Sequence, residues 1–178
     1  NAGSVYDGPI ENTDQSWSSS TTTMSANWSG FNDVTSGIHL YEYSIGSTPG
    51  ATNVLTWTEG GQETSFTEEV ALVTGDTYYI SVRATDGAGN VSNISTSNGV
   101  TIDAIDPVVA DVIEGDPSFD QDYQQSGSSM VISWAGSDDL RTFRNTRELS
   151  NYNVSLGTAA GESDVVDWEN VGSVDNYE

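Results

Sequence analysis

Apolar and polar residues alternate along several short segments of the chain, and a period of two is typical of half-buried β-strands. On the third such segment we expect Ser81 and Arg83 to point away from the core. Turns rich in Gly, Pro, Asn and Asp separate the segments, so the pattern predicts an antiparallel β-sandwich. The inward positions of the three clearest segments are Thr22, Met24, Ala26 and Trp28, then Tyr41, Tyr43 and Ile45, then Tyr78, Ile80, Val82 and Ala84.

One stretch, residues 137–149, departs from this period. Leu140 and Phe143 are three residues apart, which is a helical spacing, and Ser137 or Asp138 could cap the first turn. We expect one or two turns of helix in this stretch.

The chain also contains an internal repeat, and a repeat of this kind determines the architecture of a chain. Trp134 follows Trp28 by 106 residues, and Trp168 follows Trp57 by 111, so the second copy carries five additional residues between its two tryptophans. The residues 137–149 fall inside this insertion. The matched segments are 5–9 with 112–117, 27–30 with 133–136, 41–46 with 152–157, and Gly61 with Gly172.

The repeat predicts two domains, residues 1–104 and residues 105–178. The first copy continues through 77–84 and 99–103, whereas the second reaches Glu178 before any counterpart of these segments. We therefore expect the second sandwich to be incomplete in this chain, a condition that proteins normally avoid because it leaves an unpaired strand edge. Two explanations stay open: the chain is part of a longer array, or a partner donates the missing strands.

Several motifs of the first copy resemble the fibronectin type III-like modules of large bacterial secreted and cell-surface proteins. They are Trp28 on an early strand, Leu72-x-x-Gly75-x-x-Tyr78, the segment 79–84 that follows it, and Asp86-x-Ala88-Gly89-Asn90-x-Ser92. The resemblance covers nearly all of the first copy and the early strands of the second. Thr74 departs from it, since the family often has Pro at that position.

The resemblance implies tandem immunoglobulin-like, fibronectin type III-like sandwiches with strands A-B-E packed on C′-C-F-G. It implies that Trp28 fills the centre between the sheets, with Trp134 as its equivalent in the second copy. It also implies that the hydroxyl of Tyr78 bonds back to the chain near Leu72. A fold of this kind serves many unrelated roles, so it does not define a function by itself.

The charge balance excludes several functions. The chain has 27 Asp and Glu residues against 4 Arg, which gives a net charge of −23, with one His and no Cys. Such a charge repels nucleic acids and anionic membrane surfaces. The absence of Cys excludes disulfides, thiolate nucleophiles and cysteine-ligated metals. No segment approaches the roughly 18 apolar residues of a membrane span, so we expect no membrane insertion.

The sequence offers no constellation for catalysis. His39 is the sole imidazole, and we expect it to lie partly exposed near the start of a strand. The acidic doublet Glu68-Glu69 is interpreted as the fringe of a solvated strand end rather than as a pair of catalytic carboxylates. We therefore expect that the chain is not an enzyme.

Calcium is the one cofactor that the acidic composition brings into consideration, because Ca²⁺ binds six to eight oxygen ligands. In the family topology the linker residues Asp103 and Asp106 would approach Asp76 of the first module and Asp138 and Asp139 of the second. These five carboxylates are candidate ligands of an inter-domain ion. The alternative is that they are scattered, solvated acids, since none forms a recognised calcium loop.

Three of the four arginines, Arg141, Arg144 and Arg147, fall inside the insertion of the second copy. They are candidates for inter-domain salt bridges to Asp103, Asp106 or acids of the first module, which would fix the domain angle without metal. The alternative is that these arginines pair with acids of their own segment.

Trp17 lies outside the alternating faces and has polar neighbours, which is typical of sugar-binding aromatics. It is the candidate glycan-binding residue. Trp57 and Trp168 could serve similarly, but their recurrence favours a structural position.

The resemblance, together with the acidity, implies a spacer or stalk module of a long extracellular bacterial surface or secreted protein, similar to an adhesin. Its expected partners are neighbouring repeats of the same chain, then surface glycans or other surface and secretion proteins. The alternative function is an accessory glycan-binding region of a secreted, polysaccharide-active enzyme.

Overall fold

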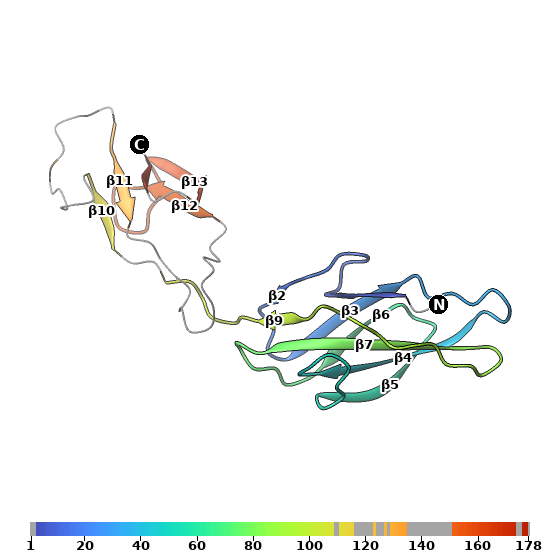
Figure 1. The fold of residues 1–178 in the computed structure, drawn as a ribbon. Helices are drawn as coiled ribbons and strands as arrows, with labels where there is room; N and C mark the ends of the chain where they lie inside the picture. Colours follow the sequence, from blue (N-terminus) through green and yellow to red (C-terminus); the bar gives the residue numbers. More distant parts are fainter. Residues whose placement is uncertain are drawn as a thin grey trace. The chain divides into compact units, whose positions relative to one another are not determined.

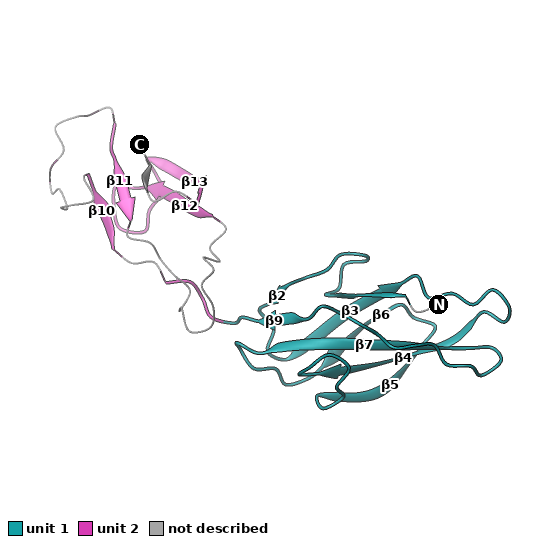
Figure 2. Cartoon of the chain, viewed as in Figure 1, with its two compact units in different colours: residues 1–104 teal, residues 105–178 magenta. Residues whose placement is uncertain are grey.

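The computed structural model describes residues 3–108, 111–115, 123, 127, 129–134, 151–173 and 176–177. The chain divides into two compact units, Asn1–Ala104 (unit 1) and Ile105–Glu178 (unit 2), coloured separately in Figure 2. The secondary structure of these described residues is entirely β, and none of them forms a helix suited to crossing a bilayer. The expected helical stretch, 137–149, lies outside the described residues.

Unit 1 consists of two sheets, which Figure 1 shows as two layers. The first has the order β1-β3-β6, with β1 Ser4–Asp7, β3 Thr23–Ser29 and β6 Ser65–Glu69. The second has the order β2-β9-β7-β4-β5, with β2 Trp17–Ser18, β9 Val100–Ile102, β7 Thr77–Asp86, β4 Ile38–Gly46 and β5 Leu55–Gly61; β8, Ser95–Thr96, also pairs with β7. This is the A-B-E and C′-C-F-G order that the resemblance implied, with β2 added in parallel to β9.

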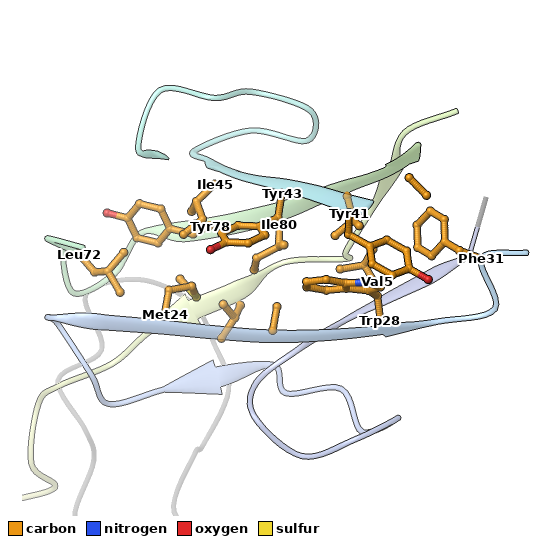
Figure 3. Packing of buried hydrophobic residues seen from close by; sticks show 14 of the residues in the cluster. Val5, Met24, Trp28, Phe31, Tyr41, Tyr43, Ile45, Leu72, Tyr78 and Ile80 are labelled. Atoms are coloured by element: carbon orange, nitrogen blue, oxygen red, sulfur yellow. The ribbon is translucent and has the colours of Figure 1, made fainter. Parts of the chain in front are cut away.

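The core of unit 1 lies between the two sheets, where inward side chains of β3 face those of β4 and β7 (Figure 3). Trp28 is 3% exposed, and its ring centroid lies 5.6 Å from that of Tyr41, 6.1 Å from Tyr43 and 6.2 Å from Phe66. Tyr43 stacks on Phe66 at 4.2 Å, so the aromatic cluster joins both sheets. Removing a buried aromatic of this size typically costs about 3–5 kcal/mol.

The period-two pattern predicts most of this core correctly. The inward positions from Met24, Tyr41 and Tyr78 onward are buried. Two residues are exceptions. Thr22, expected to face inward, is exposed because it precedes the start of β3. Ser81, expected to point to solvent, is fully buried. Its small side chain lies between neighbouring strands, opposite Ser44 of β4 and within hydrogen-bond distance of Thr96 of β8.

Tyr78 fixes the turn that leads from β6 into β7. Its side chain is 5% exposed, and its hydroxyl accepts a hydrogen bond from the backbone N–H of Val73 at 3.1 Å. The neighbouring Leu72 is buried in the same core. This is the bond back to the chain near Leu72 that the resemblance implied.

Buried Asn27 anchors the loop between β1 and β2, a role that the sequence pattern did not indicate. Its side-chain amide donates to the carbonyl oxygens of Gly8 and Ile10 at 3.1 and 3.0 Å. Its side-chain oxygen accepts from the N–H of Asn12, a residue with φ of 53°. These three bonds replace the ladder hydrogen bonds that the loop lacks.

Unit 2 contains two sheets of its own. The first has the order β10-β11-β14, with β10 Val112–Glu114, β11 Ile132–Trp134 and β14 Asn176–Tyr177. The second pairs β12, Tyr152–Leu156, with β13, Val166–Gly172. Trp134 is buried, and its ring lies 5.3 Å from that of Tyr152, much as Trp28 lies against Tyr41 in unit 1.

Strand register in unit 2 reproduces the register of unit 1. Val112 pairs with Trp134 as Val5 pairs with Trp28. Ile132 pairs with Tyr177 as Ala26 pairs with Phe66. In the second sheet, Tyr152 pairs with Gly172 and Leu156 with Val166, as Tyr41 pairs with Gly61 and Ile45 with Leu55, and both pairs of strands have irregularities at the same two places.

We predict that Tyr78→Phe destabilises unit 1 by about 1 kcal/mol, because it removes the acceptor of the Val73 N–H and leaves the ring in place. Urea unfolding measures the change. Tyr79→Phe, on the opposite face of β7, is the matched control and should cost less. Equal effects of the two substitutions would contradict a structural role for the Tyr78 hydroxyl.

Candidate functional site

His39 lies at the irregular start of β4. The pairing of β4 with β7 shifts register between Ile38 and Leu40, and His39 between them is exposed. The residue therefore lies at the surface, as expected from the sequence.

Of the acidic doublet Glu68-Glu69, only Glu69 lies in the solvated position that the sequence predicted. Glu69 is exposed, but Glu68 is half-buried and its carboxylate accepts a hydrogen bond from the hydroxyl of Tyr43. Burial, together with the bond to Glu68 and its charge, raises the pKa of Tyr43 to about 12. Glu68 thus links β6 to β4 across the sandwich rather than fringing a solvated strand end.

A pair of carboxylates, Asp7 and Asp14, forms a polar cluster in unit 1. β1 ends at Asp7, whose backbone N–H donates to Asp14 Oδ1 at 2.9 Å. Asp7 Oδ2 accepts from the N–H of Gly99 at 3.0 Å, and Asp14 Oδ2 accepts from Asn98 Nδ2 at 2.8 Å. The cluster therefore ties the end of β1 to the turn before β9, next to an open hollow of about 380 Å³ that Asp14 lines.

Burial governs the electrostatics of this cluster, because Asp7 is fully buried and its Oδ1 has no hydrogen-bond partner among the described residues. Burial raises the pKa of Asp7 to about 6; the hydrogen bonds from Ser97 and Gly99 lower it, and the charge of Asp14 raises it further. The sequence contained a signal for this position, since Asp7 shares the inward face of β1 with Val5. An acidic residue at an inward strand position is typical of a buried polar group that other parts of the fold hydrogen-bond.

The outer face of the second sheet carries a cross-strand cluster of Trp57, Glu42 and Arg83 on β5, β4 and β7. The guanidinium of Arg83 binds Glu42 through two bonds of 2.8 and 2.9 Å, which hold the pKa of Glu42 below its usual range. The same guanidinium lies 4.4 Å from the ring centroid of Trp57. Arg83 is the only Lys or Arg in residues 1–104. The positive charge that Lys and Arg side chains give to unit 1 therefore lies at this cluster.

Three of the five predicted calcium ligands, Asp76, Asp103 and Asp106, lie within the described residues. Asp76 and Asp106 are exposed and Asp103 is half-buried, while Asp138 and Asp139 lie outside the described residues. The backbone N–H of Ile102 donates to the carbonyl of Asp76, which brings the strand before Asp103 beside the turn of Asp76. Among the residues that the structure describes, no three His, Asp or Glu side chains are grouped to hold a metal.

The predicted inter-domain arginines, Arg141, Arg144 and Arg147, also lie outside the described residues. Their salt bridges to the linker therefore stay a prediction.

The structure separates the three surface tryptophans that the sequence grouped together. Trp17, the candidate glycan-binding residue, is 48% exposed on the short edge strand β2. Trp57 is half-buried beneath Arg83, whereas its repeat equivalent Trp168 is 64% exposed on β13. A repeated position can therefore be covered in one unit and open in the other.

Comparison with protein-family models and with curated proteins gave no match to this chain. The function is therefore argued from the arrangement of its own residues.

We predict that acid stabilises unit 1 through Asp7. The folded-state pKa of about 6 lies above the ordinary value of 3.8, so this stabilisation is complete below about pH 4 and is lost as the pH rises through 6. The difference is at most about 3 kcal/mol. Asp7→Asn keeps an acceptor for the N–H of Gly99 but removes the buried charge. The variant should therefore lose this pH dependence, which urea unfolding measures at roughly pH 4.5 and pH 7.5.

Asp76→Asn removes the same formal charge from an exposed turn and is the matched control. It should retain the pH dependence of the unmodified chain. If Asp7→Asn and Asp76→Asn respond alike, the buried carboxyl is not the titrating group.

Proposed function

We propose that the chain is a non-catalytic spacer or stalk module of a long extracellular bacterial surface or secreted protein, built from fibronectin type III-like sandwiches. The observation that carries the proposal is the matched strand register of the two units. A polypeptide can span a long distance by repeating one structural module along its length. The proposal places the ligand-binding parts of the parent protein elsewhere.

The chain path through unit 1 supports this role. β1 begins beside Ser29 at one end of the sandwich, and β9 ends beside Asp76 at the other (Figure 1). A unit that the chain enters at one pole and leaves at the opposite pole adds its full length to an array. A pull on both ends loads the terminal strands along their length, so several hydrogen bonds must break together.

The acidity suits an extracellular, salt-containing medium. With a net charge of −23, the surface stays hydrated, and dissolved ions screen the self-repulsion over roughly 8–10 Å. Neighbouring repeats of the same chain are the partners that this role requires, and nucleic acids and membranes are not among them.

We predict that the full chain, stretched between its ends, shows a discrete unfolding step for unit 1 that releases on the order of 300 Å of chain. The parallel pair β2 and β9 resists this load through bonds that include Asp103 N–H to the Ser18 carbonyl at 2.8 Å. Asp103→Pro removes that donor and should lower the unfolding force, whereas Asp103→Asn keeps it. Gradual extension without a step would contradict the spacer function.

The alternative function, glycan binding for a polysaccharide-active enzyme, is favoured by the exposure of Trp17. Saturable retention on a polysaccharide that disappears in Trp17→Ala would establish it. Retention on none of the polysaccharides tested would leave the spacer proposal in place.

An inter-domain calcium ion would strengthen the spacer by fixing the linker, with Asp103, Asp106, Asp76, Asp138 and Asp139 as its proposed ligands. The chain should then melt at a higher temperature in millimolar Ca²⁺ than in chelator, whereas Mg²⁺ should have less effect because it demands a stricter geometry. Identical melting in all three conditions would contradict the calcium site without affecting the spacer function.

A further inference from the structure

Trp17 and Tyr79 lie on the same outer face of the second sheet of unit 1, in which β9 separates β2 from β7 (Figure 1). Trp17 of β2 pairs with Thr101 of β9, and Thr101 pairs in turn with Thr77 of β7. Paired residues of neighbouring strands share a face, and the hydroxyls of Thr77 and Thr101 lie 2.8 Å apart. Tyr79 is two residues beyond Thr77, so its side chain lies on this face as well.

The ring of Tyr79 leans over the backbone beside β9. A Cβ added to Gly99 would come within 2.6 Å of Tyr79 Cε1, so the absence of a side chain at Gly99 makes room for the ring. Gly99 also has a φ of 99°, a conformation that favours glycine. Tyr79 is half-buried and Trp17 is 48% exposed. The side of the Tyr79 ring that does not contact Gly99 is therefore left toward solvent, on the same face as Trp17.

The strand register sets the spacing of these two rings. Trp17 is level with Thr77, two strands away from β7 and two residues before Tyr79. By the standard dimensions of a sheet, the Cα atoms of Trp17 and Tyr79 are roughly 12 Å apart. One pyranose unit of an extended polysaccharide has roughly half this length, so the two rings can stack on alternate sugars of one chain. Alternate sugars of a β-1,4-linked chain present the same face, because successive sugars are rotated by half a turn.

Hydrogen-bonding groups lie on both sides of Tyr79. Thr77 and Thr101 lie between the two rings, and their hydroxyls can donate or accept. Arg83 is four residues beyond Tyr79 on the same face of β7, where it binds Glu42. The side chains of Arg83 and Glu42 are 30% and 20% exposed, so this pair can also contact sugar hydroxyls. Aromatic faces with a few polar groups beside them are complementary to a sugar chain.

The charge of unit 1 selects among sugar chains. Residues 1–104 contain twelve acidic residues and one arginine, and that arginine is engaged by Glu42. Such a surface repels polysaccharides that carry carboxylate or sulfate groups. A neutral polysaccharide is not repelled, and its hydroxyls bond to carboxylates as well as to neutral groups.

We propose that this outer face binds an extended, neutral, β-1,4-linked glycan, with Trp17 and Tyr79 stacked on alternate sugars of one chain. The proposal goes beyond the spacer function. It rests on the alternative glycan-binding function for the role of Trp17, and it deepens that function by adding Tyr79 and by naming the class of glycan.

The probe is the β-1,4-linked hexasaccharide of glucose, titrated into the full chain in a calorimeter. It should bind saturably. The α-1,4-linked hexasaccharide of glucose is the matched control and should not bind, because it has the same composition but coils instead of extending. The β-1,4-linked disaccharide should bind at least about ten-fold more weakly than the hexasaccharide, because it cannot reach both rings.

Substitutions test the two rings separately. Trp17→Ala and Tyr79→Ala should each weaken binding of the hexasaccharide about ten-fold, and each should abolish its advantage over the disaccharide. Tyr79→Phe keeps the ring and should bind within about two-fold of the unmodified chain. Trp168→Ala, at an exposed tryptophan of unit 2, is the matched control and should leave the affinity unchanged.

The comparison of sugars uses the unmodified chain, so it does not depend on how any variant folds. Equal affinity for the two hexasaccharides, or for the β-linked hexasaccharide and disaccharide, would overturn the proposal. Loss of binding in Trp17→Ala but not in Tyr79→Ala would also overturn it and would leave the alternative glycan-binding function standing. An absence of saturable binding to the β-linked hexasaccharide would overturn it without affecting the spacer function.

Discussion

The packing of Trp28 between two sheets is the constraint on which unit 1 depends. Its ring contacts aromatic residues of both layers, and its indole nitrogen has no hydrogen-bond partner in the described part of the chain. The ring therefore acts through shape and apolar area rather than through polarity. Because Trp28 must face the core, the register of β3 with β1 and β6 is specified, since a slip of one residue would turn the ring outward.

The same constraint recurs in unit 2. Trp134 lies against Tyr152 and is buried, and among the described residues the strands that carry these two rings belong to sheets of three and two strands. The proposed spacer role arises from this plan, whose strand register the described strands of unit 2 match.

Much of this fold could be predicted from the sequence, because the inward positions of β3, β4 and β7 follow a strict period of two and the tryptophans recur. The polar interior could not be predicted in the same way. Asn27 and Ser81 occupy outward positions by alternation, yet loop bonds in one case and flanking strands in the other bury them. The proposed calcium and arginine sites depend on how loops of two units meet, and strand periodicity carries no information about that geometry.

Native-state hydrogen exchange tests the shared plan most directly, because it reports strand pairing one amide at a time. Every backbone amide in the middle of β4, which has partners on both edges, should be protected. In β12, the amides that point toward β13 should be protected, as the amides of β4 that point toward β5 should be. An absence of protection along β12 would contradict a second unit whose β12–β13 pair repeats the β4–β5 pair of the first.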